Sequence, residues 1–270
     1  MTRVHPVLEC RKLAQRYRVR GGYQVVFDDL DFTIGGHQFV SLIGASGCGK
    51  STLLRLVLGS EQPWKGTLCS HGEPITHPDR TRGIVFQKYS LFPHRTVLDN
   101  VTFGLELSRT GLIESWLTWP WYRRHRRRFR DEAMHHLAQV KLDEHAGKYP
   151  HQLSGGMQQR VAIAQALIMK PRILLMDEPF GALDPATRES LQRAIVAAFH
   201  DHSTTILLVT HNLEEALHVG TRLLVLARDA RHPAAGSRIV IDQPITQSAA
   251  LDSPETRELL AHVRHAGFAG

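Results

Sequence analysis

The sequence predicts an α/β fold, in which helices cover both faces of a mostly parallel β-sheet and a helical segment is inserted between strands. Three short apolar runs have the length of buried strands, at residues 38–43, 173–176 and 205–210. Each run is followed by polar residues and then by a helical pattern. Strands that alternate with helices in this way imply a mostly parallel sheet with both faces covered.

The first run ends in glycines and is followed at once by a helical pattern at residues 50–58, which gives a strand, a loop and a helix. Residues 91–170 read as largely helical, and we expect them to form a helical subdomain inserted into the α/β core. A turn at 233–237 precedes a short strand at 238–241, and residues 252–266 have the pattern of one amphipathic helix.

The composition indicates a folded globular chain. With 270 residues, the chain is long enough for one large domain or for one domain with a subdomain. No apolar run approaches the roughly 20 residues that cross a bilayer. Charge or proline interrupts the apolar residues at the N-terminus, so we expect no signal peptide and a cytoplasmic protein. The three cysteines, Cys10, Cys48 and Cys69, are too scattered to predict a disulfide framework or a metal site.

The positive charge is concentrated in one segment. The formal net charge is +7, and residues 116–130 (WLTWPWYRRHRRRFR) hold six arginines and no acid, so the rest of the chain carries +1. The basicity is therefore a local feature and does not by itself predict a nucleic-acid partner.

Residues 44–52 (GASGCGKST) match the spacing of a phosphate-binding P-loop in its strand-to-helix context. Glycines let successive backbone N–H groups converge on phosphate oxygens, and the start of the helix adds its positive end. Lys50 is predicted to reach the β- and γ-phosphates, and Ser51 to bind magnesium. The predicted nucleotide-binding residues here are Gly44, Ala45, Ser46, Gly47, Cys48, Gly49, Lys50, Ser51 and Thr52.

Asp177 and Glu178 follow the second buried strand, and we expect them at its C-terminal edge beside the phosphates. Asp177 suits a magnesium ion, and Glu178 is placed to polarise the attacking water. Taken alone, the pair could also be an acidic cluster at a helix N-terminus. A metal-nucleotide site would remove the cost of two carboxylates at the end of an apolar strand.

The segment 153–159 (LSGGMQQ) resembles the signature sequence of ATP-binding-cassette (ABC) ATPases. Other motifs of that family occur in the family's order: Gln87 resembles the Q-loop, 181–184 (GALD) the D-loop, and His211 the switch histidine. The resemblance covers roughly residues 8–245. It implies a P-loop NTPase fold, with a RecA-like mostly parallel core, an antiparallel β portion and the inserted helical subdomain.

Ser154 is also a good helix N-cap, so the turn at 154–156 offers free N–H groups at a positive helix end, which is a second anion site. The resemblance implies that this turn and the P-loop lie on opposite sides of the fold. Each ATP is then held between Lys50 of one copy and the signature of a second copy. The ATP ligands implied on that second copy are Ser154, Gly155, Gly156, Gln158 and Asp184.

The resemblance gives His211 and Gln87 catalytic roles beside Glu178 and Lys50, and lets Gln87 sense magnesium. His211 read alone could be a hydrogen-bonded core histidine. Tyr17 is the candidate to stack on adenine, although Tyr23 lies close enough to be an alternative.

The chain departs from the family at an insertion that spans 108–131. Trp116, Trp119 and Trp121 precede the six arginines, a pattern typical of contact with a membrane surface or with a transmembrane partner. The alternative is a solvated helical extension whose tryptophans pack on the subdomain.

We expect an ABC domain over 1–245, with its core at about 1–90 and 171–245, its helical subdomain at about 91–170, and a helical tail at 246–270. The expected function is the ATPase subunit of an importer at the cytoplasmic face of the membrane. Its expected partners are a second copy, a separate permease whose helix docks at 87–98 through Leu91 and Phe92, and indirectly an external binding protein. The motifs look most like the nitrate, sulfonate and taurine importer group. The alternatives are a soluble ABC protein that acts on ribosomes or nucleic acid, and the motor of an exporter.

Overall fold

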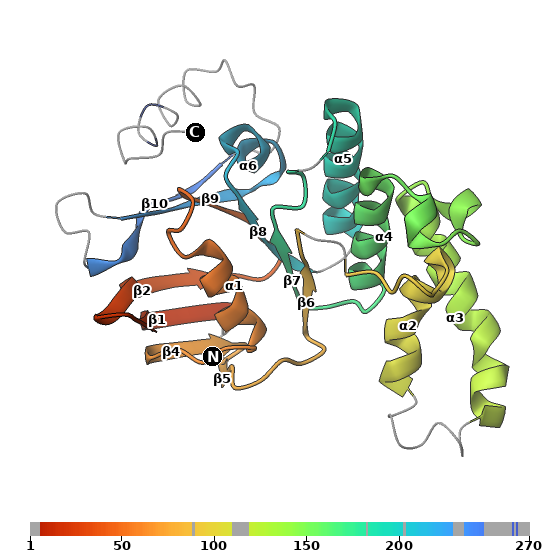
Figure 1. Cartoon of the computed structure of the whole chain (residues 1–270), viewed down its shortest axis with the longest axis horizontal. Helices are drawn as coiled ribbons and strands as arrows, with labels where there is room; N and C mark the ends of the chain where they lie inside the picture. Colours follow the sequence, from red (N-terminus) through yellow and green to blue (C-terminus); the bar gives the residue numbers. More distant parts are fainter. Residues whose placement is uncertain are drawn as a thin grey trace, which may run out of the picture.

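The computed structural model describes residues 6–87, 90–109, 119–181, 183–201, 204–228 and 235–245, together with Ala261 and Val263. Among these residues, ten strands form one sheet in the order β5-β4-β1-β2-β10-β9-β3-β8-β7-β6 (Figure 1). The strands are β1 Leu8–Val19, β2 Gly22–Ile34, β3 Phe39–Ile43, β4 Lys65–Ser70, β5 Glu73–Pro74, β6 Arg82–Val85, β7 Ile173–Asp177, β8 Thr205–Thr210, β9 Arg222–Arg228 and β10 Ser237–Pro244.

The sheet has a parallel part and an antiparallel part. The parallel part contains β9, β3, β8, β7 and β6, and each of these strands pairs in parallel with the next. The pairs β1–β2, β1–β4, β4–β5 and β9–β10 are antiparallel. The mixed sheet predicted from the sequence and its family resemblance is therefore confirmed.

The helices are α1 Lys50–Leu58, α2 Val97–Arg109, α3 Trp119–Gln139, α4 Gly155–Leu167, α5 Pro185–Asp201 and α6 Leu213–Val219, with short 3₁₀ turns η1 Asp143–His145 and η2 Pro150–Gln152. The predicted bounds of α1 and β8 are confirmed to the residue. None of the helices among the described residues is both long enough and apolar enough to cross a membrane.

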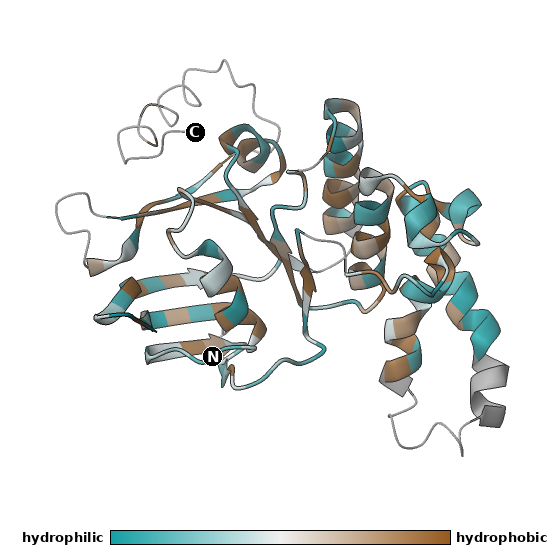
Figure 2. Ribbon diagram, in the orientation of Figure 1, coloured by the Kyte–Doolittle hydropathy of each residue, from teal (hydrophilic) through white to brown (hydrophobic). Residues whose placement is uncertain are grey.

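Helices cover both faces of the parallel strands. On β7, Ile173 and Leu175 belong to the apolar cluster that contains Leu53 of α1. The alternate residues of β7, Leu174 and Met176, belong to the cluster formed with α4 and α5. Successive side chains of a strand point to opposite faces, so α1 lies on one face and α4 and α5 lie on the other. Figure 2 shows the apolar colouring of these central strands.

The helical subdomain lies at one end of the sheet (Figure 1). Its core joins α2, α3 and α4 through residues such as Val101, Leu137 and Val161. Within the predicted insertion, α2 extends to Arg109 and α3 begins at Trp119, whereas Trp116 lies outside the described residues. Most of the predicted tail helix also lies outside them, although Val263 packs against α6. The exact domain boundaries stay a prediction.

Candidate functional site

The predicted P-loop connects the end of β3 to the start of α1. Gly44 admits no side chain, because a Cβ there would collide with the carbonyl oxygen of Leu226 and lie 2.6 Å from Cys48 Sγ. Gly49 caps α1 in a left-handed conformation, with φ of 109°. The loop therefore packs closely against the start of α1, where the free N–H groups of the helix can stabilise a bound anion.

Lys50 is 7% exposed, and its ammonium is held over the loop. Nζ donates to the carbonyl oxygens of Gly44 at 2.6 Å and Ala45 at 3.2 Å. Thr52 is buried on the same helix. A cavity of about 300 Å³ beside the loop is lined by Gln24, Ala45, Ser46, Gly47, Cys48, Leu226, Ala227 and Arg228. Gln24 and Arg228 belong to no motif, so sequence patterns could not single them out.

Asp177 lies at the C-terminal end of β7, with its Oδ1 3.5 Å from Ser51 Oγ. Burial and the negative charge of Glu178 raise the pKa of Asp177, while the Ser51 hydrogen bond and the charges of Lys50 and Arg55 lower it. A carboxylate and a hydroxyl side by side are oxygen ligands of the kind that Mg²⁺ prefers. Because burial is the main cause of the raised pKa, a cation beside Asp177 would favour its charged form, and this donor set fits the ion.

Glu178 is held between two predicted catalytic residues from neighbouring strands. Gln87 Nε2 donates to its Oε2 at 3.3 Å, and His211 Nδ1 lies 3.1 Å from its Oε1. The backbone of Glu178 is left-handed, with φ of 45°, and its N–H donates to the carbonyl of Val209. Left-handed non-glycine residues cost about 1–3 kcal/mol and cluster at functional sites. The imidazole of His211 is 58% exposed, so it can reach a ligand.

The signature turn begins α4, as predicted. Ser154 is the N-cap, and its Oγ accepts a hydrogen bond from the Met157 N–H at 3.3 Å. Gln158 donates to the carbonyl of Leu153, which stiffens the turn. The Gly155 and Gly156 N–H groups belong to the first turn of α4, where a helix has no internal acceptor for them.

The signature turn packs against the D-loop segment. A Cβ at Gly156 would lie 2.5 Å from Thr187 Cγ2, so only glycine allows this approach. Asp184 accepts a hydrogen bond from the Thr187 N–H at 3.0 Å and is exposed. Ala182 of this segment lies outside the described residues.

The predicted site residues therefore form two groups. Lys50, Ser51 and Asp177 lie beside Glu178, Gln87 and His211 at the C-terminal ends of the parallel strands. Ser154, Gly156 and Asp184 form the second group around the start of α4, on the face of the sheet opposite α1.

Tyr17 is half-buried, packs on the core next to α1, and accepts a hydrogen bond from Arg55 at 3.0 Å. Tyr23 is 58% exposed, and the guanidinium of Arg16 lies 4.0 Å from its ring centre. The choice between the two rings as the adenine contact stays a prediction.

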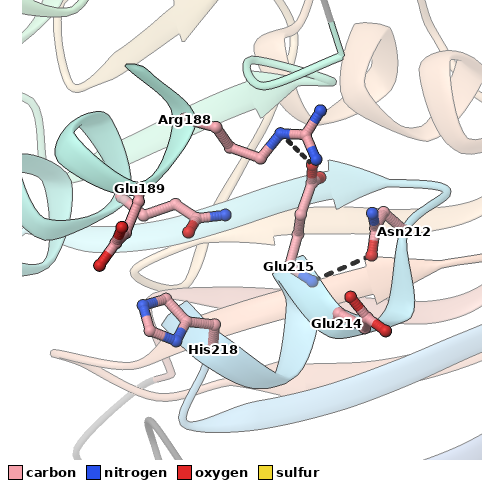
Figure 3. A pocket seen from close by; sticks show the side chains of 7 residues that line it. Arg188, Glu189, Asn212, Glu214, Glu215 and His218 are labelled. Carbon is pink, nitrogen blue, oxygen red and sulfur yellow. Dashed lines mark hydrogen bonds and ion pairs between the residues drawn. The ribbon is translucent and has the colours of Figure 1, made fainter. Parts of the chain in front are cut away.

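A network behind His211 was missed by the sequence analysis. It joins Arg188 of α5 to Asn212 and Glu215 at the start of α6, and these three residues line a cavity of about 280 Å³ (Figure 3). Asn212 caps α6 by accepting from the Glu215 N–H at 3.1 Å. The Asn-x-x-Glu spacing could have indicated the cap. No sequence signal could have indicated Arg188, because it is distant along the chain.

Comparison with known proteins gives a consistent result. The family model described as ABC transporter matches residues 27–181. The chain is 39% identical to the nitrate import ATP-binding protein NrtD of Synechococcus elongatus over 244 residues, which cover 89% of this chain and 83% of that protein. It is 38% identical to the bicarbonate transport ATP-binding protein CmpD of the same species over 221 residues, which cover 82% of this chain and 75% of that protein.

Among solved structures, the chain is similar to the dimeric ATP-binding cassette MJ0796 in a post-hydrolysis state bound to ADP and Pi. The TM-score is 0.73 at 27% identity, and the match covers 88% of this chain and 99% of that one.

Proposed function

The chain belongs to the ABC transporter family as an ATP-binding and ATP-hydrolysing subunit, and on that premise we propose that two copies close on two ATP molecules to drive a separate permease. The observation that carries the proposal is the geometry of Glu178. Its carboxylate is fixed between Gln87 and His211, beside the Ser51–Asp177 pair. This is the arrangement that hydrolysis of a γ-phosphate needs, with a base, an orienting amide and a histidine around one point.

Each residue of the first group has a defined task. Lys50 and the N–H groups of 44–52 bind the β- and γ-phosphates, and Tyr17 packs on the adenine. Ser51, Asp177 and Gln87 would hold Mg²⁺, which would neutralise phosphate charge when bound. Glu178 polarises the attacking water, and His211 donates a hydrogen bond to the γ-phosphate.

The second group completes the site of the other copy. Ser154, Gly155, Gly156 and Gln158 present N–H groups and side-chain donors at the positive end of α4, and Asp184 lies next to them. Because α1 and α4 cover opposite faces of the sheet, ATP on one chain meets the α4 of its mate. The dimeric state of the similar cassette MJ0796 supports this pairing.

The permease docks beside the edge strand β6. A cavity of about 250 Å³ there is lined by residues of β6, α2 and α4, including Phe103 of α2, and by Phe86 and Met169, which follow β6 and α4. Phe86 is 42% exposed and offers apolar surface to one cytoplasmic helix of the permease. Of the two predicted contacts, Leu91 packs partly on the core clusters, and Phe92 stacks edge-on against Phe103 at 4.6 Å.

The transported substrate is a small anion that enters the cell. The names of the nitrate and bicarbonate relatives support this class, since both substrates are small oxyanions. The sulfonate and taurine assignments stay predictions. The chain works at the cytoplasmic face of the membrane, and an external binding protein supplies the substrate to the permease.

The arginine-rich part of α3 contacts the anionic membrane surface beside the permease. Arg126, Arg127, Arg128 and Arg130 are all exposed, whereas Phe129 between them is buried and fixes the helix. Each arginine near an anionic surface contributes about 1 kcal/mol. The side chains of 116–122, the aromatic half of the insertion, lie outside the described residues.

Replacing Glu178 with Gln tests the proposed function. The variant keeps the shape of the side chain but loses the basic carboxylate, so ATP should bind while hydrolysis falls by about 10²-fold or more. With ATP and Mg²⁺ the variant should run as a dimer in size-exclusion chromatography with light scattering. Glu144→Gln, an exposed acid in η1, is the matched control and should behave as the wild type. Full turnover by Glu178→Gln would remove Glu178 from its catalytic role.

A further inference from the structure

Glu215 is a buried carboxylate that the proposed mechanism does not use. Its side chain is 7% exposed, and its Oε2 accepts a hydrogen bond from Thr210 Oγ1 at 2.7 Å. Its Oε1 lies 3.4 Å from Arg188 Nε, which makes an ion pair rather than a well-aligned hydrogen bond (Figure 3). Burial raises the pKa of Glu215, while the Thr210 hydrogen bond and the charges of Arg188 and His211 oppose that shift.

The contacts of Glu215 fix the backbone on both sides of His211. Thr210, which precedes His211, is tied to the Glu215 carboxylate. Asn212, which follows His211, donates its N–H to Thr210 Oγ1 at 3.0 Å and accepts the Glu215 N–H through its side chain. His211 itself is exposed and is held only by its neighbours and by Glu178. The closed ring of contacts is therefore what orients the imidazole.

Arg188 connects this ring to the turn that precedes α5. Its side chain donates from Nη2 to the carbonyl of Leu183 at 3.1 Å, and its backbone N–H donates to the carbonyl of Asp184 at 2.9 Å. The same guanidinium faces Glu215. A displacement of the 183–184 turn must therefore move Arg188, and with it the charge that faces Glu215.

We propose that Glu215 and Arg188 are positioning residues for hydrolysis. Glu215 keeps His211 oriented toward Glu178, and Arg188 transmits the position of the 183–184 turn to Glu215. This inference rests on the proposed function, because it assumes that His211 acts on ATP. Neither residue touches the nucleotide, so their loss should slow the chemical step without weakening ATP binding.

The test compares ATP hydrolysis by Glu215→Gln and by wild-type protein. Gln keeps the shape and can still accept from Thr210, but it loses the charge that Arg188 pairs with. We expect kcat to fall by about tenfold while KM for ATP changes by less than about twofold. The kcat of Arg188→Ala should fall by a similar factor. The variant that carries both changes should lose no more activity than either single variant, because both residues act in one chain of contacts.

A second comparison separates positioning from a general structural role. In a His211→Ala background, Glu215→Gln should cause no further loss, since the residue it positions is gone. A further tenfold loss in that background would overturn the proposal, as would wild-type kcat in Glu215→Gln. Thr210→Val breaks the ring of contacts at another point, because it removes the hydroxyl that Glu215 and Asn212 share, with little change in shape. It replaces Glu215→Gln if that variant unfolds below the assay temperature.

Glu189→Gln is the matched control. Glu189 lines the same cavity but pairs with Arg193 at 2.7 Å, so kcat should stay at the wild-type value. An inactive wild type would reject the proposed function itself. An active wild type with an unaffected Glu215→Gln would reject only this inference.

Discussion

Asp177 is a single residue whose carboxylate lowers the stability of the fold without nucleotide but suits the binding of a divalent cation. Burial and the adjacent Glu178 raise its pKa, so folding without nucleotide disfavours the charged form of this side chain. At neutral pH the folded state must nevertheless hold a carboxylate there, which lowers its stability. A bound divalent cation would reverse this effect, because it would favour the charged form.

Asp177→Asn should therefore raise the melting temperature of the protein without nucleotide at pH 7.5. For a domain approaching this size, each 1 kcal/mol of stability corresponds to about 2–4 °C in melting temperature. Because the folded pKa is raised, the wild type loses stability as pH increases from the ordinary value of about 4 through the folded pKa. The advantage of the variant should grow over that interval and then level off, as measured by thermal unfolding from pH 4 to pH 8.

The same variant should lose the stabilisation that Mg²⁺ and ATP give the wild type, because it lacks the charge that holds the ion. Asp242→Asn removes an exposed acid that pairs with Arg222 and serves as the control. A lower melting temperature for Asp177→Asn at pH 7.5 would contradict this view of the site.

The sequence could predict residues that are adjacent along the chain and whose chemistry is specific. The P-loop at 44–52 and the pair Asp177–Glu178 are of this kind, and the structure places them together. The contacts of Glu178 with Gln87 and His211 follow from parallel strands that end at the same edge. Arg188 and Glu215 could not be predicted, because their meeting depends on how α5 packs beside α6.

At the scale of elements, the best predictions concern short strands buried on both faces and bounded by glycine or polar residues, such as β3, β7 and β8. The long strands β1 and β2 were not identified one by one. Their pairing contains register shifts, for example between Cys10 and Leu13, and such bulges interrupt the alternation of apolar and polar residues that marks a strand. Only the family resemblance predicted an antiparallel portion.

The arginines of α3 give a prediction at this scale. Replacing Arg126, Arg127 and Arg128 together with Gln should weaken binding to vesicles that contain anionic lipid. At about 1 kcal/mol for each residue, the loss is about 3 kcal/mol, or roughly 100-fold in affinity. Co-sedimentation with anionic and neutral vesicles at low salt measures the effect.

The control for this experiment removes the same number of positive charges outside α3. Arg11, Arg18 and Arg193 are exposed and lie on β1 and α5 rather than on α3. Their triple change to Gln should leave vesicle binding close to that of the wild type. Equal losses in both triple variants would mean that net charge, not the α3 surface, decides binding.

For the molecule as a whole, the central feature is the placement of two predicted anion-binding helix starts on opposite faces of one sheet. α1 packs on the face formed by Ile173 and Leu175, and α4 packs on the face formed by Leu174 and Met176. On the proposed function, a triphosphate on the P-loop would be open toward solvent until a second copy brings its α4 to it. ATP then acts as a contact between two chains, and its hydrolysis removes part of that contact.

The structure of the Glu178→Gln variant grown with ATP and Mg²⁺ tests this feature most directly. We expect the γ-phosphate to lie within about 3.5 Å of Lys50 Nζ of one copy and of the Ser154 hydroxyl or the Gly156 N–H of the other. A structure in which ATP occupies the P-loop but the 154–156 turn lies far from every phosphate, in every pairing of copies, would contradict it.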